Sequence, residues 1–218
     1  MKLSRSTFLF VLVILLFSCS STKITSSWRA DQATAKPYRN VMVWGILPVN
    51  DSSTRRQIET HLVNDLVAKG YHAVSSMEVY ASKAFKKLTD KEIIDEFRST
   101  GVDAVITLVL LRKEKEEQYY PGGVFNQPVN NFNNLDKYSS TVYEKVFSPG
   151  YYISTTNYFW EANLFDIAEN RLNYSVRTSS FEPATTEELA HKNGLIIVKD
   201  MLKKKVIPDL SPKKEQSN

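Results

Sequence analysis

Three apolar runs of strand length constrain the fold of this 218-residue chain more than any other feature. They are Val41–Leu47, Tyr71–Ser75 and Asp103–Leu110. A continuous apolar run of this length is typical of a strand that is covered on both faces. Helix-like stretches separate the runs, and the order strand, helix, strand, helix, strand predicts a parallel core sheet with right-handed crossovers.

The two helix-like stretches carry their own boundary signals. In the first, Ile58, Leu62 and Leu66 form an apolar stripe with Val63 and Val67, and Gly70 follows at the position that ends a helix. The second opens with the capping box Thr89-x-x-Glu92. Both stretches are therefore predicted to be helices that bury one face on the sheet.

The second half of the sequence has a different pattern. Apolar and polar residues alternate over Phe159–Phe165 and again over Arg171–Thr178, which predicts a hairpin with one buried face. Val142–Phe147 is predicted to be an extra strand, and Thr185-x-x-Glu188 to cap a last helix. The fold class is α/β (α+β): a βαβαβ core, then antiparallel hairpin strands and a C-terminal helix, in a mixed sheet with helices packed on it.

The amino terminus has the features of a secretory signal. Lys2 and Arg5 precede the apolar run Phe8–Phe17, which is too short to span a bilayer. Leu16-Phe17-Ser18-Cys19 resembles the lipobox of bacterial lipoproteins. That resemblance implies cleavage after residue 18 and acylation of Cys19, which would hold the protein on membrane lipid. The alternative is a plain signal peptide with an incidental cysteine.

The residues around Cys19 also suggest a location and a domain layout. The lipoprotein resemblance implies the periplasmic face of the outer membrane, because Ser20 replaces the aspartate that retains some lipoproteins in the inner membrane and no acidic cluster follows. Residues 19–39 are rich in small and polar residues and are predicted to be a tether. Residues 40–208 are predicted to form a single domain, and residues 209–218 a flexible basic tail.

Composition excludes several classes of function. The net charge is +4, but the excess lies at the two ends and the body is close to neutral, which argues against a nucleic-acid partner. The seven glycines do not form a phosphate-binding motif. One cysteine and three histidines without metal-ligand spacing predict no metal site, and no cofactor is expected.

A family resemblance rests on the run Val41–Leu47, on Arg56-x-x-Glu59 with Leu66 and Gly70, and on Asp103–Ile106. Over about residues 24 to 207 this layout looks like a family of uncharacterised Gram-negative outer-membrane lipoproteins. It is also similar to the amino-terminal domain of TolB and to curli-secretion and penicillin-binding-protein-activator lipoproteins. The resemblance implies an assembly or regulatory module rather than an enzyme.

Two groups of charged residues are candidates for chemistry. Arg55 and Arg56, at the start of the first predicted helix, could hold an anion, although a surface ion pair between Arg56 and Glu59 is favoured. Acid–base catalysis needs two carboxylates in one pocket. Glu161 with Asp103 or Asp51 is the candidate set, although cross-strand pairing of Glu161 with Arg171 or Arg177 is favoured.

The most unusual segment is Tyr119–Trp160, which holds twelve of the 25 aromatic residues. Gly122–Asn134 within it is rich in glycine and asparagine and is predicted to be an exposed loop. We expect four tyrosines at the base of this loop to form a binding surface, which are Tyr119, Tyr120, Tyr151 and Tyr152. The alternative is that these aromatic rings fill one face of a sheet.

The sequence thus leaves three hypotheses for function. The favoured one is a non-catalytic, lipid-anchored periplasmic module that binds an envelope protein or peptidoglycan, in a binding, assembly or regulatory role. The second is a small hydrolase of envelope glycans that uses Glu161 with Asp103 or Asp51. The third is a mainly structural lipoprotein. Two carboxylates within about 5–10 Å of each other in a cleft would favour the hydrolase.

Overall fold

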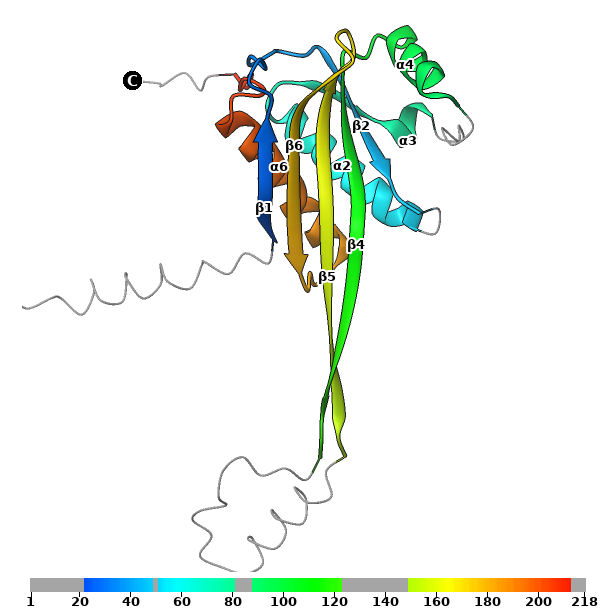
Figure 1. The fold of residues 1–218 in the computed structure, drawn as a ribbon, viewed down its shortest axis with the longest axis vertical. Helices are drawn as coiled ribbons and strands as arrows, with labels where there is room; N and C mark the ends of the chain where they lie inside the picture. Colours follow the sequence, from blue (N-terminus) through cyan, green and yellow to red (C-terminus); the bar gives the residue numbers. More distant parts are fainter. Residues whose placement is uncertain (1–21, 49–50, 81–87, 123–148, 213–218) are drawn as a thin grey trace, which may run out of the picture. The chain divides into compact units, whose positions relative to one another are not determined.

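A computed structural model describes residues 22–48, 51–80, 88–122 and 149–212 (Figure 1). The chain divides into two compact units, one of residues 1–113 with 158–218 and one of residues 114–157. The described part is a mixed α/β fold, as predicted, with one six-stranded sheet in the order β1-β6-β5-β4-β2-β3. The elements are β1 (Thr22–Arg29), β2 (Asn40–Ile46), α2 (Ser52–Val67), β3 (His72–Ser75), α3 (Ser76–Val79), α4 (Asp90–Ser99), β4 (Ala104–Tyr120), β5 (Tyr151–Asp166), β6 (Arg171–Phe181) and α6 (Thr186–Lys203).

The predicted βαβαβ core is present. Strand β2 lies between β3 and β4 and is parallel to both, with Val41 opposite Ala73 on one side and Ala104 on the other. Central strands of this kind are buried on both faces, which explains their continuous apolar sequences.

The predicted helix boundaries are confirmed by their caps. The Thr89 hydroxyl accepts a hydrogen bond from the N–H of Glu92, and the Glu92 carboxylate accepts one from the N–H of Thr89, which completes the capping box of α4. The Thr185 hydroxyl caps α6 in the same manner, by accepting from the N–H of Glu188. Gly70 follows α2 with φ of 84°, a conformation that glycine adopts at little cost.

Apolar side chains form a core on each face of the sheet. The larger core lies under α2 and α6, where Leu62 and Ile197 pack with Trp160, Ala162 and Leu164 of β5. The smaller core, on the face that α4 covers, is built from Met42, Phe97, Val105 and Ile167 with Trp44 beside them. Trp160, Ala162 and Leu164 on the predicted inward face of β5 are buried. In the predicted stripe of α2, Ile58, Leu62 and Leu66 are buried as well, whereas Val67 is 52% exposed.

The prediction of a tether over residues 19–39 is wrong from Thr22 onward. Residues 22–29 form β1, an edge strand that pairs antiparallel with β6 from Thr22 opposite Ser180 to Arg29 opposite Tyr174. Ala30, Ala33 and Tyr38 beyond the strand are buried. The sequence does not reveal this strand because an edge strand needs little apolar sequence, since its hydrogen bonds to β6 hold it in place.

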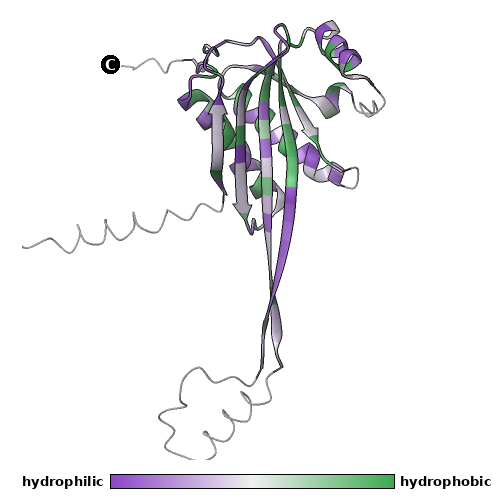
Figure 2. Ribbon diagram, viewed as in Figure 1, coloured by the Kyte–Doolittle hydropathy of each residue, from purple (hydrophilic) through white to green (hydrophobic). Residues whose placement is uncertain are grey.

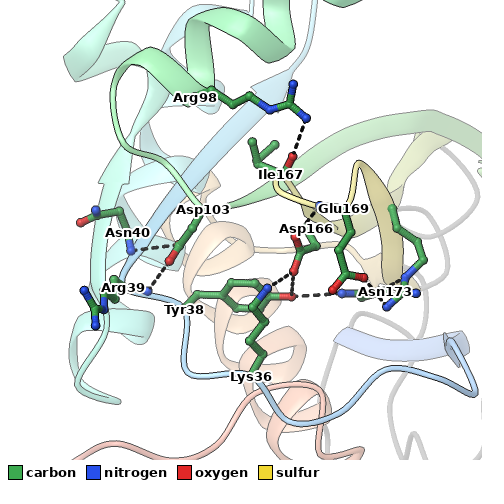
Figure 3. Close-up of polar contacts among 11 residues, drawn as sticks. Lys36, Tyr38, Arg39, Asn40, Arg98, Asp103, Asp166, Ile167, Glu169 and Asn173 are labelled. Carbon is green, nitrogen blue, oxygen red and sulfur yellow. Dashed lines mark hydrogen bonds and ion pairs between the residues drawn. The ribbon is translucent and has the colours of Figure 1, made fainter.

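A buried polar cluster fixes the chain that leaves β1 (Figure 3). Asp166, at the end of β5, is fully buried; its carboxylate accepts hydrogen bonds from Lys36 Nζ at 2.5 Å, from the hydroxyl of Tyr38 at 3.3 Å and from the N–H of Glu169 at 3.0 Å. Asn173 on β6 donates to the Tyr38 hydroxyl. Residues 36–38 are thereby held on the turn between β5 and β6.

Strands β4 and β5 are much longer than the sequence predicted. Strand β4 continues through the charged segment Arg112–Glu117 to Tyr120, and β5 begins at Tyr151. Figure 2 shows the change along β4 from hydrophobic residues in its first half to hydrophilic residues beyond them. Most of the predicted loop Gly122–Asn134 and all of the predicted strand Val142–Phe147 lie outside the described residues.

Candidate functional site

The four tyrosines singled out by the sequence come together as two cross-strand pairs in the unit of residues 114–157. Tyr119 contacts Tyr152, with ring centroids 4.8 Å apart and ring planes at 42°. Tyr120 stacks on Tyr151 at 5.3 Å and 11°. Because successive side chains of a strand point to opposite faces, the two pairs lie on opposite faces of the β4–β5 ribbon. We call these four residues the tyrosine pairs.

The tyrosine pairs are largely open to solvent. Tyr119, Tyr151 and Tyr152 are 52%, 58% and 68% exposed, whereas Tyr120 is half-buried. Adjacent Ile153 is exposed as well. These rings therefore do not fill the core, and the alternative that they form a buried sheet face is not supported. Exposed tyrosine rings offer rigid apolar area with a polar hydroxyl, which suits a protein surface or a sugar ring.

A glycine allows one of these rings to lie against the backbone. A Cβ atom at Gly150 would fall 2.2 Å from the hydroxyl oxygen of Tyr119, closer than any side chain can approach. The strand beside the rings carries charges of both signs, with Lys115 and Glu117 in an ion pair at 2.6 Å. The surface is therefore aromatic without a strong net charge.

The three carboxylates of the hydrolase hypothesis are not brought together. The side chain of Asp103 accepts hydrogen bonds from the N–H groups of Arg39 and Asn40, where β2 begins. Asp51 follows the other end of β2, about 20 Å away for a seven-residue strand. Glu161 lies six residues before Ile167, whose N–H donates to the Asp103 carbonyl, so about 20 Å of strand separates Glu161 from Asp103 as well. Asp51 and Glu161 are apart because β5 lies two strands from β2, about 10 Å, and because Glu161 follows Trp160, which is buried on the face that α2 covers, and therefore points to the opposite face.

Glu161 has the structural role that the sequence favoured. Arg177 on β6 donates to Glu161 at 2.8 Å, and Asn163 donates at 3.1 Å. These hydrogen bonds, that of Arg177 first, lower the pKa of the Glu161 carboxyl group. The group is therefore poorly suited to act as a general acid, which needs a raised pKa.

The predicted surface pair of Arg56 with Glu59 is wrong. Glu59 is fully buried, and its partner is Arg55, whose Nε lies 2.8 Å from Oε1 of Glu59. Arg56 is exposed. The Glu59 carboxylate accepts hydrogen bonds from five donors: the N–H groups of Gly45 and Met77, the hydroxyls of Ser75 and Ser76, and Arg55 Nε.

The position of Glu59 bears on the suggested anion site. Gly45 and Ser75 lie at the carboxyl ends of the parallel strands β2 and β3, where α/β sheets commonly bind ligands. Here a carboxylate of the chain itself takes up the donors at that position. A Cβ atom at Gly45 would lie 3.0 Å from Glu59 Oε1 and 2.9 Å from Arg55 Cγ, so the strand needs glycine there. This arrangement does not support anion binding by Arg55 and Arg56.

The structure bears only in part on the predictions about the lipid anchor and the metal site. Cys19 lies outside the described residues, so its acylation stays a prediction. None of the helices in the described part of the chain is long and apolar enough to cross a membrane. Within the same part, no group of three or more histidine, cysteine or acidic side chains is arranged to hold a metal ion.

Comparisons with known proteins give distant similarities of fold. No protein-family model matches the sequence, and a search of curated proteins finds no match. A PelC dodecamer structure from Paraburkholderia phytofirmans is 10% identical, with 86% of this chain and 99% of that chain covered and a TM-score of 0.44. Lipoprotein GNA1162 from Neisseria meningitidis is 13% identical, with 76% and 99% covered and a TM-score of 0.40.

A third solved structure, a putative neuraminyllactose-binding hemagglutinin homolog from Helicobacter pylori, is 11% identical, with 82% and 92% covered and a TM-score of 0.38. One of these three proteins is a lipoprotein by name, and none is TolB, a curli-secretion protein or an activator of a penicillin-binding protein. Identities and TM-scores this low do not transfer a function, so the family that the sequence resembles stays a prediction.

Proposed function

We propose that this chain is a lipid-anchored protein of the cell envelope that binds a partner through the tyrosine pairs. The observation that carries the proposal is the exposure of Tyr119, Tyr151 and Tyr152 on a two-stranded ribbon. Large aromatic rings are costly to leave in water, and they are enriched at the centres of binding surfaces. A ribbon of only two strands also gains little stability of its own, so contact with a partner would stabilise it.

The anchor in this proposal is acylated Cys19, on the periplasmic face of the outer membrane. It is supported by the lipobox-like sequence Leu16–Cys19 and by the short apolar run before it. We further propose that the protein acts by binding and not by catalysis. The dispersed positions of Asp51, Asp103 and Glu161 support this part of the proposal.

The partner that we propose is an envelope protein or peptidoglycan. Both offer what the tyrosine pairs recognise: apolar or ring-shaped surface together with groups that hydrogen-bond to phenolic hydroxyls. The mixed charges beside the rings, with Lys115 paired to Glu117, do not favour a strongly charged polymer.

The test uses a double variant, Tyr119→Ala with Tyr152→Ala, which removes one pair. The matched control is Phe181→Ala, because Phe181 is 55% exposed at the end of β6, outside the unit that carries the tyrosine pairs. We expect the double variant, and not the control, to lose co-sedimentation with purified sacculi or site-specific photocrosslinks from position 153 to one envelope protein. Unchanged binding in both assays would remove the tyrosine pairs as the binding surface.

A further inference from the structure

The absence of a tether places the lipid anchor close to the folded body. Strand β1 begins at Thr22, and only residues 20 and 21 separate it from Cys19. Three residue steps span at most about 11 Å even when fully extended. If Cys19 carries acyl chains in a bilayer, Thr22 therefore lies within that distance of the anchored residue, and the surface around Thr22 faces the lipid.

An open groove of about 680 Å³ lies at that surface. It is lined by Thr22 itself, by the end of α2 and by the outer side of α6. Five apolar residues form most of its wall, which are Ala68, Leu195, Ile196, Val198 and Leu202. Leu195 is 46% exposed, and Val67, which precedes the lining residue Ala68, is exposed as well. The exposed part of this wall, chiefly Ala68 and Leu195, is in contact with water in the isolated body, which is unfavourable, whereas Val198 is buried in the larger core.

Three lysines, Lys69, Lys192 and Lys199, line the same groove. Lys69 is paired with Asp209 at 3.0 Å, and Lys192 with Glu188 at 2.5 Å, whereas Lys199 is exposed. Lysines around an apolar surface suit an anionic bilayer, because their stems contact acyl chains while their ammonium groups meet phosphates.

Asp65 is the single acidic residue among those that line the groove. Burial raises the pKa of its carboxyl group, an effect that nearby His191 and His61 oppose. A carboxyl group that protonates more readily is less unfavourable beside lipid than an ordinary aspartate.

We propose that the groove between α2 and α6 rests on the bilayer and takes up an acyl chain of an anionic phospholipid. The inference rests on the acylation of Cys19 in the proposed function, and it adds a second, non-covalent contact that orients the body on the membrane. It explains why an apolar groove with lysines lies beside the first residue of β1.

The test uses the full mature protein in vesicles of phosphatidylcholine, alone or mixed with phosphatidylglycerol. Mass spectrometry first establishes acylation of Cys19, whose sulfur then carries the lipid and cannot react with a thiol label. Leu195→Cys carries an environment-sensitive fluorophore, and Lys91→Cys on α4, also exposed, is the matched control. Thermal unfolding establishes that both labelled proteins are folded.

We expect the label at position 195, and not that at position 91, to shift to the blue and to lose emission to nitroxide-bearing phospholipid. Both effects should be larger in anionic vesicles, and Lys199→Gln should reduce that difference. Equal access of iodide to the two labels overturns the proposal. So does shielding from iodide without quenching by labelled phospholipid, because the acyl chains of Cys19 itself would then fill the groove.

The failure of this inference can be told apart from failure of the proposed function. An unmodified Cys19 in the mass spectrum removes the anchor and with it the docking of the groove. An acylated Cys19 with both labels open to iodide overturns the docking alone. Neither result changes the outcome of the binding test on Tyr119 and Tyr152, which uses a different unit of the chain.

Discussion

At the scale of single residues, Glu59 shows what sequence reasoning could not find. Pairs at i, i+3 and i, i+4 are both neighbours on a helix, so the sequence cannot choose between Arg55 and Arg56 as its partner. The choice depends on β3 and on the turn after it, which bring Ser75, Ser76 and Met77 to the carboxylate. That contact is tertiary and leaves no local pattern.

We predict that Glu59→Ala lowers the free energy of unfolding by about 3–5 kcal/mol, because it leaves a partly buried guanidinium and several buried donors without their acceptor. Urea unfolding measures the loss. Glu59→Gln should lose part of the stability, and Arg56→Ala, which alters an exposed residue, should lose almost none. A small effect of Glu59→Ala would mean that the carboxylate is not buried as described.

Asp166 gives a prediction for the dependence of stability on pH. Burial alone raises the pKa of this carboxyl group, but hydrogen bonds from Lys36 and from the N–H of Glu169 outweigh it and the pKa falls below its ordinary value. The folded state therefore binds the proton less tightly than the unfolded state. The resulting stabilisation is complete above the unfolded pKa of about 3.9 and is lost as the pH falls through the folded pKa.

Asp166→Asn should consequently lower the unfolding midpoint at pH 7 and show a smaller further fall at acidic pH than the native protein. Thermal unfolding between pH 7 and pH 3 measures both effects. The exposed Asp31, changed to Asn, serves as a control that should leave the profile of the native protein almost unchanged. An Asp166→Asn profile parallel to that of the native protein would contradict the role given to this carboxylate.

At the scale of elements, the sequence patterns that led to correct predictions belong mainly to helices and strands that bury one face. The stripe of α2 and the alternation in β5 reflect contact with the larger core. The caps of α4 and α6 were predictable for another reason, because each is a local hydrogen bond between residues three apart in the sequence. Two patterns failed for the opposite reason. The edge strand β1 is mostly polar, and the outer part of β4, Arg112–Glu117, is exposed to solvent on both faces. Neither segment therefore requires apolar residues at regular intervals.

The concentration of aromatic residues in the sequence points to the four tyrosines, but it does not predict which ring contacts which. About thirty residues separate Tyr120 from Tyr151, and a shift of one residue in register would place different rings opposite each other. Only the paired strands show that Tyr119 meets Tyr152 and Tyr120 meets Tyr151.

Because its ring is exposed, Tyr151→Ala should cost less than about 1.5 kcal/mol, the scale of one aromatic pair. Tyr174→Ala, which removes a buried ring from β6, should cost about 3–5 kcal/mol. Chemical denaturation of the two variants under the same conditions compares them. A large loss for Tyr151→Ala would return the ring to a structural role and leave the binding proposal without its surface.

At the scale of the whole molecule, the position of β1 changes where the folded body begins. The sequence placed that boundary at residue 40, but the pairing of β1 with β6 makes Thr22–Arg29 part of the sheet. The same observation brings the predicted anchor at Cys19 next to the body, with residues 20 and 21 between them. A protein anchored this closely would have few orientations on a membrane, and the proposed contact of the groove beside Thr22 with lipid depends on that restriction.

The boundary leads to a last prediction, which compares a chain that starts at Thr22 with one that starts at Lys36. The first keeps every described strand and should unfold in one cooperative step. The second loses β1, the hydrogen bond between Thr22 and Ser180, and the strand that covers the edge of β6. An uncovered edge pairs readily with other chains, so this shorter protein should melt earlier and self-associate. Thermal unfolding and size-exclusion chromatography measure the two effects, and equal midpoints with a monomeric shorter chain would show that the folded body begins after β1.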